Sequence, residues 1–432
     1  MRSLKDEGVV KKRKAAELNK RPWKILYLIL CLCLLAFTAY QFLNFLPAQT
    51  TGWDYQAYVS GVLAFEHGIN PYIPSNLILF LPQDLSSAGM TFDYPPHTLY
   101  FFGLLDTFLV FHSMTLYYVL LLLFVVVSAY LMVNLDNKPH YLFLITLLLT
   151  GFMSLTWNFL TGNSPLIFLL LFAVTFTFLV KKKYWESSVV MGLSSAFSLF
   201  TAPFVALFLL VERPIKERIA IVFLSLGIVA LLFVFDYVVN PLFLKSYLNL
   251  MMSSTGPFTY SGGWNEPTVY MMFKEFLKGI SPENIVPLII VSSLYLALVA
   301  FATGKYYQKN KENNLKILSL AMLSIFMILP RITPYDFIIL VVPLYLLFKD
   351  CSYRVKSLVL LVITIPPLFV WEIAAFGVQL PSIFDYAQAF SLILVFITAI
   401  LFDQASTESD SAGKEGKKSG RTRKNSKKSA EE

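Results

Sequence analysis

The chain has 432 residues, of which 56% are hydrophobic, 16% are aromatic and only 14% are charged. A soluble domain is usually about 45–50% apolar and about 25% charged, so this composition argues against a soluble protein. Long apolar runs predict a polytopic, all-α membrane protein, and their lack of period-two alternation disfavours a β-barrel. The net charge of +8 lies at the two ends and in short loops, where it indicates membrane topology and no nucleic-acid partner.

Taken in order, the chain begins with a polar, basic stretch at 1–24, which predicts a cytoplasmic tail. An apolar run at 25–46 predicts the first span of a transmembrane domain that extends over 25–402. Residues 403–432 are rich in Ser, Lys, Glu and Gly, so we expect a disordered, basic cytoplasmic tail. The apolar segments after the first, from which we expect about 12 transmembrane segments in all, are 97–111, 115–135, 142–157, 164–180, 187–211, 216–238, 285–304, 315–329, 335–348, 356–376 and 383–402.

The distribution of basic residues predicts the orientation in the membrane. If 1–24 lies in the cytoplasm, all but four of the 35 Lys and Arg residues fall on the cytoplasmic side, as the positive-inside rule requires. The four exceptions are Lys245, Lys274, Lys278 and Arg331. We therefore expect a multi-pass protein of the cell membrane with both termini in the cytoplasm. Two long loops, 47–111 and 239–284, would be extracytoplasmic.

The same charge distribution makes two segments unusual. Segment 97–111 is short and contains Asp106, and counting it as a span would invert the orientation, so we expect a short interfacial helix. Segment 187–211 lies between two basic clusters. We expect two half-helices that meet near Thr201-Ala202-Pro203, below the outer surface and beside a cavity that opens outward.

Asp54 is the first candidate for a chemical role. It lies between Trp53 and Tyr55, directly after the first predicted span. A carboxylate near aromatic and apolar groups can have the raised pKa that a general base needs. The alternative is a loop carboxylate that caps a helix.

Several short motifs follow the first span in a defined order. They are Asp54-Tyr55-x-x-Tyr58, Gly68-Ile69-Asn70-Pro71-Tyr72, Tyr94-Pro95-Pro96, Gly162-Asn163-Ser164-Pro165, and Tyr335-Asp336 ahead of Pro343. Together they resemble the motifs of the GT-C superfamily of membrane glycosyltransferases, and in particular glycosyltransferase family 87. The resemblance covers roughly residues 25–400 and implies a GT-C-like fold whose long first extracytoplasmic loop carries short interfacial helices.

The chain departs from that family at two places. Many members have a Lys before the proline of the broken helix, where this chain has Thr201-Ala202-Pro203. Other members have a His in the late motif, where this chain has Asp336 and Phe337. Both departures remove a cation near a donor phosphate.

The resemblance implies an inverting transfer of a hexose, usually mannose, from a polyprenyl-phosphate donor to a glycolipid, glycan or protein acceptor, with Asp54 as general base. The lipid-linked donor is a co-substrate, membrane lipids surround the chain, and no further cofactor or metal is implied. The leaving phosphate already carries its charge, so a cation can stabilise it. Arg331 is the expected phosphate partner, and an ion pair with Asp336 is the alternative. The outer loops contain no Asp-x-Asp pair, which argues against a metal-bound nucleotide sugar.

Eleven outer residues are expected to bind the substrates. Some have a structural alternative, since Asn70 can shape its loop, Asp93 can belong to a turn, and Tyr and Trp are common at membrane interfaces. His67 and His97 are too isolated in the sequence to predict a metal site. The eleven are Tyr55, Tyr58, Asn70, Asp93, Tyr94, Asn163, Trp264, Asn265, Glu266, Arg331 and Asp336.

Two other functions remain open for such a chain. A transporter or flippase of a lipid-linked or small polar substrate would have charged residues at the membrane midplane and related repeats in its two halves. No clear internal repeat is visible. A non-catalytic membrane scaffold would not need long outer loops with carboxylates near apolar groups.

Overall fold

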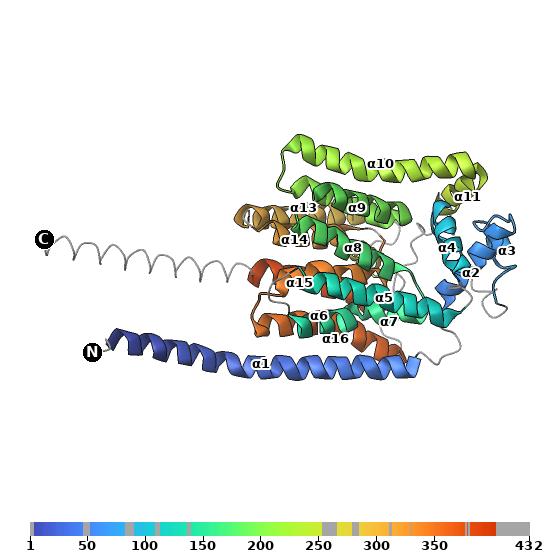
Figure 1. The fold of residues 1–432 in the computed structure, drawn as a ribbon. Coiled ribbons are helices and arrows are strands. Elements are labelled where there is room, and N and C mark those ends of the chain that lie inside the picture. Colours follow the sequence, from blue (N-terminus) through green and yellow to red (C-terminus); the bar gives the residue numbers. More distant parts are fainter. Residues whose placement is uncertain are drawn as a thin grey trace.

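The computed structural model of the protein describes residues 4–45, 52–82, 90–108, 113–135, 140–252, 266–278, 285–310, 313–329, 331–375, 378 and 381–402. Within these ranges the chain is helical and contains no β-strand, as the composition predicts. Most of the long helices run alongside one another as a bundle, and a group of short helices covers one end of it (Figure 1).

The elements follow one another along the chain in this order. The first half contains α1 (Leu4–Phe45), α2 (Trp53–Glu66), α3 (Pro74–Leu77), α4 (His97–Thr107), α5 (Met114–Val133), α6 (Tyr141–Thr150), η2 (Gly151–Met153), α7 (Ser154–Thr161), α8 (Pro165–Val180), α9 (Tyr184–Phe197) and η3 (Leu199–Leu210). The second half contains α10 (Ile215–Val239), α11 (Pro241–Met252), α12 (Val269–Lys278), α13 (Ile285–Lys309), α14 (Asn314–Ile328), η5 (Asp336–Leu340), α15 (Val341–Phe348), α16 (Tyr353–Ala375) and η6 (Ser382–Tyr386), followed by helix at 387–402.

Seven helices in the described ranges are long and apolar enough to cross a membrane. They are Arg21–Leu43, Met114–Val133, Tyr141–Thr161, Ile215–Val239, Val286–Lys309, Tyr353–Ile373 and Ser382–Phe402. Shorter apolar helices occur at Pro165–Val180, Leu199–Leu210, Asn314–Ile328 and Asp336–Phe348. The chain is therefore an all-α membrane protein, while the number of about 12 segments stays a prediction.

The basic N-terminal stretch and the first span form one element. Helix α1 begins at Leu4, so the residues predicted as a tail continue into the apolar segment as a single helix. Helix α4 has 11 residues, about 16 Å at 1.5 Å per residue, whereas the hydrocarbon core is about 30 Å thick. It is thus too short to span, and it runs across the direction of the bundle (Figure 1). The location of α4 at the extracytoplasmic membrane interface stays a prediction.

The segment between the two basic clusters folds back on itself. Ser198 leaves the helical conformation (φ −148°, ψ 116°) and separates α9 from η3. The two ends then lie together, because Lys182 Nζ is 3.5 Å from Glu212 Oε2 and the Arg213 guanidinium lies 5.2 Å from the centre of the Tyr184 ring. Two half-helices are therefore present, as expected.

The turn between these half-helices, however, precedes the expected site at Thr201-Ala202-Pro203. A proline clashes with the carbonyl four residues before it and cannot donate a hydrogen bond to it. For Pro203 that carbonyl belongs to Leu199, so one continuous α-helix through this segment is disfavoured. The α-helix ends at Phe197. The chain continues as the 3₁₀ element η3, which contains Pro203.

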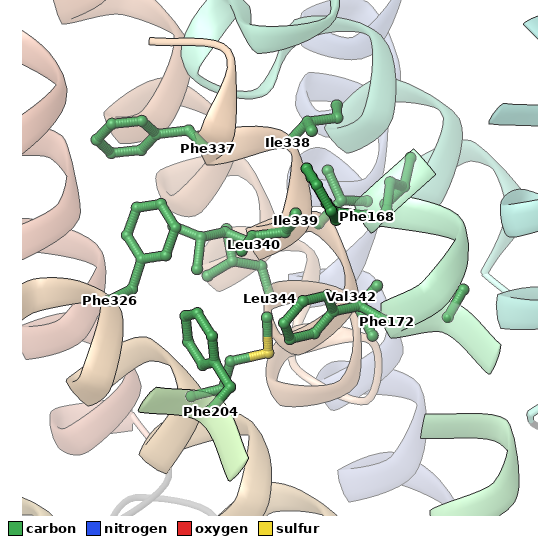
Figure 2. Packing of buried hydrophobic residues seen from close by; sticks show 14 of the residues in the cluster. Phe168, Phe172, Phe204, Phe326, Phe337, Ile338, Ile339, Leu340, Val342 and Leu344 are labelled. Carbon is green, nitrogen blue, oxygen red and sulfur yellow. The ribbon is translucent and has the colours of Figure 1, made fainter. Parts of the chain in front are cut away.

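Aromatic side chains in the middle of the bundle join the elements that support the late motif. The Phe204 ring of η3 lies 5.2 Å from Phe172 of α8 and 6.4 Å from Phe326 of α14, and Phe326 lies 5.1 Å from Phe337 of η5 (Figure 2). In a membrane bundle such rings stabilise the fold through van der Waals packing against one another. Because Asp336 directly precedes Phe337, this packing fixes the start of η5.

The short helices α2, α3, α4 and α11 gather at the end of the bundle away from the first residues of α1 (Figure 1). Aromatic contacts hold them together. The Tyr72 ring lies 5.8 Å from Phe92 and 5.6 Å from Tyr247 of α11, and the Tyr72 hydroxyl donates to the Tyr94 carbonyl at 2.8 Å. The loop that carries the first motifs is thereby fixed over this end of the bundle.

Candidate active site

Asp54 lies in the first turn of α2, which two glycines hold against the junction of α7 and α8. Gly52 (φ +81°) precedes α2 and Gly162 (φ +69°) follows α7, both in the left-handed region that glycine adopts most easily. A Cβ on Gly162 would lie only 2.7 Å from the Cβ of Tyr55. The Gly52 amide also donates to the Leu160 carbonyl at 2.8 Å. This close approach places Asp54 beside the residue that follows Gly162.

That residue, Asn163, joins a connected set of polar groups. Its Nδ2 donates to Asp54 Oδ2 at 2.8 Å, and its Oδ1 accepts from the Tyr58 hydroxyl and from the Ser164 amide, both at 2.7 Å. The Tyr58 hydroxyl lies 3.5 Å from the Tyr94 hydroxyl, which in turn is hydrogen-bonded to the Ser164 hydroxyl. We call Asp54, Tyr58, Tyr94, Asn163 and Ser164 the Asp54 cluster.

The environment of Asp54 changes its acidity. Burial raises the pKa of this carboxyl to about 7, the side chains of Thr161 and Asn163 oppose the rise, and the charges of Asp93 and Asp336 add to it. The residue nevertheless keeps some accessible surface. A carboxyl with a pKa near neutrality is ionised in about half of the molecules at pH 7 and can accept a proton from a hydroxyl group.

A second set of charged groups lies beside the cluster. Arg331 Nε is 2.9 Å from Oε1 of Glu266, whose side chain is only 3% exposed. Burial raises the pKa of Asp93, and the Arg331 charge opposes that rise, so the guanidinium acts on this carboxyl as well. Asp336 is also within electrostatic reach of Arg331. We call Asp93, Glu266, Arg331 and Asp336 the Arg331 group.

Arg331 forms its ion pair with Glu266 and not with Asp336, the partner that the sequence offered as an alternative to a phosphate. That alternative joined Arg331 to Asp336, five residues further along the chain. Asp336 Oδ2 instead accepts the amide and the hydroxyl of Thr333, at 2.9 and 2.5 Å, and closes the turn that starts η5. The close carboxylate of Arg331 comes from Glu266, which precedes α12.

One finding decides the family. The model of glycosyltransferase family 87 matches residues 92–330, which is more than half of the chain. The chain belongs to glycosyltransferase family 87. A search of curated proteins finds no match.

The family assignment makes the chain a membrane glycosyltransferase, as the order of its motifs predicts. The family 87 match includes part of both sets of polar residues. Asp93, Tyr94, Asn163, Ser164 and Glu266 lie within the matched range, whereas Asp54, Tyr58, Arg331 and Asp336 lie outside it.

Not every predicted site residue of this family 87 member joins the cluster. Tyr55 is buried, with its ring 5.1 Å from that of Tyr117. Asn70 donates to the Ser246 hydroxyl at 2.8 Å and accepts from the Tyr72 amide at 3.1 Å, so it connects its loop to α11. These contacts are with other parts of the fold, and the role of both residues in substrate binding stays a prediction. Two further candidates, Trp264 and Asn265, lie outside the described residues.

Two hydroxyl residues contribute that were not singled out from the sequence. Ser164 binds Tyr94 and supplies the amide that fixes Asn163, and Thr333 binds Asp336. Each is adjacent to, or three residues from, a predicted site residue. A Ser before Pro165, the first residue of α8, is also a common helix start, and that pattern could have identified Ser164.

A buried ion pair near the site was also missed, because its two residues are 139 apart. His97 Nδ1 lies 2.7 Å from Asp236 Oδ2, and His97 Nε2 lies 3.0 Å from the Ala196 carbonyl at the end of α9. A carbonyl only accepts, so Nε2 carries a proton, and a further proton lies between Nδ1 and Oδ2. The His97–Asp236 pair is therefore neutral as a whole and joins α4, α9 and α10.

These groups define what the site can do chemically. Asp54 can accept a proton, and Arg331 can contact an anion, because its side chain is 28% exposed despite the ion pair with Glu266. Among the residues that the structure describes, no three or more His, Cys, Asp or Glu side chains are grouped so as to hold a metal ion. The arrangement suits transfer between an acceptor hydroxyl and an anionic donor.

Proposed function

We propose that this family 87 protein transfers a hexose, mannose in the first place, from a polyprenyl-phosphate donor to a hydroxyl group of a glycolipid, glycan or protein. The acceptor oxygen attacks the anomeric carbon from the side opposite the phosphate, the bond from that carbon to the phosphate oxygen breaks, and Asp54 takes the hydroxyl proton. Polyprenyl phosphate leaves, and the anomeric configuration inverts. The observation that carries the proposal is the Asp54 carboxyl, partly accessible and with its pKa raised to about 7.

The raised pKa supports the role of base. A carboxylate with an ordinary pKa near 4 is a weak proton acceptor, whereas a general base is most effective when its pKa is close to the working pH. Burial is the main cause of the shift in Asp54. An acceptor hydroxyl that enters the cluster would meet a carboxylate from which much of the water is already removed.

The charge of the Arg331 group supports a monophosphate donor. One guanidinium is surrounded by the carboxyl groups of Asp93, Glu266 and Asp336. A polyprenyl-phosphate sugar is a phosphodiester with a single negative charge, which one guanidinium can bind and neutralise. A nucleotide diphosphate sugar carries at least two negative charges, which the surrounding carboxyl groups would repel.

We place this chemistry on the extracytoplasmic face of the cell membrane. The basic clusters at 181–183 and 213–218 lie together, as the contacts between Lys182 and Glu212 and between Arg213 and Tyr184 require. The Asp54 cluster belongs to the opposite end of the bundle, with α2 and α4 (Figure 1). Basic clusters favour the cytoplasmic side, which supports an extracytoplasmic site.

A donor panel tests the proposed function. The purified protein is incubated with extracted membrane glycolipids and with radiolabelled polyprenyl-phosphate-mannose, polyprenyl-phosphate-glucose or guanosine diphosphate mannose. We expect transfer from a polyprenyl-phosphate sugar and none from the nucleotide sugar, with inversion at the anomeric carbon of the product. Asp350→Asn, which changes an exposed carboxylate beside Lys349, is the control and should transfer normally. No transfer from either lipid-linked sugar, or preferred use of the nucleotide sugar, would overturn the proposal.

A further inference from the structure

The orientation of the Asn163 side chain is determined by its neighbours. An amide presents an oxygen that accepts and a nitrogen that donates, and the two ends look alike in shape. The backbone amide of Ser164, 2.7 Å away, can only donate, so the end that faces it is the oxygen. The Tyr58 hydroxyl donates to the same oxygen. The nitrogen of Asn163 must therefore face Asp54.

The groups that orient this amide are themselves rigidly held. The Tyr58 ring stacks on Phe102 of α4, with centroids 5.1 Å apart and planes within 7°. The backbone at Asn163 is fixed by the hydrogen bond from its amide to the Asn158 carbonyl at 3.1 Å, and Gly162, which ends α7, lies against Tyr55 of α2. Asn163 thus reaches Asp54 from a frame built by three helices.

The contact distinguishes the two oxygens of Asp54. Nδ2 of Asn163 donates to Oδ2 at 2.8 Å. A donor on one oxygen fixes the rotation of the carboxylate plane and occupies lone-pair capacity of that oxygen. The proton taken from an acceptor would then go to Oδ1, the oxygen that Asn163 does not contact.

We propose that Asn163 is a positioning residue, whose amide, oriented by Tyr58 and the Ser164 amide, holds Asp54 by Oδ2 and presents Oδ1 to the acceptor hydroxyl. This inference rests on the proposed function, since it needs Asp54 to act as base. It replaces the expectation that Asn163 binds substrate directly. It also gives Tyr58 a role through Asn163 and not through the sugar.

The same hydrogen bond affects the titration of the base. A donor to the charged form favours that form, so the Asn163 contact lowers the pKa of Asp54 from the higher value that burial alone would give. Removing the donor should raise the pKa. The pH at which transfer reaches half of its maximum would then move upward by about one unit or more. A residue that merely filled space would change the rate and leave this midpoint in place.

The experiment compares pH profiles of kcat for the wild type, Asn163→Ala and Tyr58→Phe. For Asn163→Ala we expect about a tenfold or greater loss of kcat at pH 7, little change in donor KM, and a midpoint shifted to higher pH. Tyr58→Phe keeps the ring stacked on Phe102 and removes only one of the two donors that orient the amide. It should give a smaller shift in the same direction.

Asn70→Ala is the matched control, because it removes an asparagine of the same end of the molecule whose bonds go to Ser246 and Tyr72. It should leave the midpoint unchanged, whatever its effect on yield. If both Asn163→Ala and Tyr58→Phe keep the wild-type midpoint, the inference is wrong even though the enzyme transfers sugar. If Asn163→Ala does not fold, the shift in Tyr58→Phe alone decides. Lack of transfer by the wild type would instead contradict the proposed function.

Discussion

Asp54 and Asp236 lie at the same end of the molecule and differ in what their partners allow. Asp54 keeps some accessible surface, and the partner of its Oδ2 is the neutral amide of Asn163. Asp236 is only 1% exposed, and its Oδ2 shares a proton with His97. Asp54 is thus held by the amide of Asn163, which does not ionise, whereas Asp236 is held by the imidazole of His97, which is a base.

This difference in partners explains why the Asp54 carboxyl suits catalysis, whereas the Asp236 carboxyl suits a role in stabilising the fold. An amide positions a carboxylate without taking its charge, so Asp54 remains the group that gains and loses a proton. An imidazole neutralises a buried carboxylate, and breaking such a pair leaves one charge or dipole buried without its partner. The His97–Asp236 pair therefore connects α4, α9 and α10, while Asp54 faces the acceptor in our proposal.

The strongest test of this comparison makes the same substitution at both carboxyls. Asp54→Asn removes the base and should lower transfer by about 10²–10⁴-fold, the usual contribution of general base catalysis. Asp236→Asn keeps a hydrogen-bond partner for His97 and should retain most of the transfer per folded molecule. Transfer rates of the two purified variants check this, and equal losses in both would remove the distinction between the two sites.

Truncation of Asp236 should affect stability where the substitution of Asp54 affects catalysis. Asp236→Ala leaves His97 without its buried partner, and removing one member of such a pair typically costs about 3–5 kcal/mol. Denaturant or thermal unfolding of the detergent-solubilised protein measures the loss. Asp54→Ala serves as the comparison at the same pH and should lose less. A decrease below about 1 kcal/mol for Asp236→Ala would show that the pair contributes little to folding.

Two glycine substitutions distinguish the effect of backbone strain from the effect of the close approach between Gly162 and Tyr55, which holds the Asp54 cluster. Gly162→Ala adds a Cβ 2.7 Å from Tyr55 to a residue at φ +69°, which should cost about 1–3 kcal/mol and reduce transfer about tenfold. Gly68→Ala adds the same strain at φ +70°, with nothing within 4 Å of the new Cβ. It should cost about 1 kcal/mol and leave the transfer per folded molecule unchanged. Equal kinetics for both variants would contradict the importance of the close approach.

The smallest expected effect is a gain in the stability of Asp54→Asn over the wild type, which appears only as the pH rises. The folded-state pKa of Asp54, about 7, lies above its value in the unfolded chain, near 4. The unfolded state therefore ionises first, and stability falls as the pH rises from about 4 to about 7, then levels off. Asp54→Asn avoids this loss and should be about 1–2 kcal/mol more stable than the wild type above pH 7, allowing for partial solvent access. At about pH 4 the difference should disappear, and an opposite trend in thermal unfolding would contradict the raised pKa.

The sequence predicts the helical membrane fold because composition and apolar run length depend on residues close together in the chain. Asp54, Tyr94 and Asn163 could be named as candidates because short motifs carry them. Their hydrogen bonds could not be predicted, since Asn163 lies 109 residues after Asp54 and meets it only through the approach of Gly52 and Gly162.

Predictions failed where nearness along the chain was misleading. Asp336 follows Arg331 closely, yet the turn at Thr333 occupies its carboxylate, and Glu266 from another part of the chain forms the ion pair. The proline of the broken helix marked an interruption, but the chain turns before Pro203, at Ser198.

The most direct test of the central claim is the pH profile of single-turnover transfer in the wild type and in Asp54→Asn. If Asp54 is the base, the wild-type rate should rise between about pH 5.5 and about pH 8.5 with one ionisation near 7. The residual rate of Asp54→Asn should not depend on pH over this range. If Asp54→Asn keeps the same rise with the same midpoint, another group is the base and the central claim is wrong.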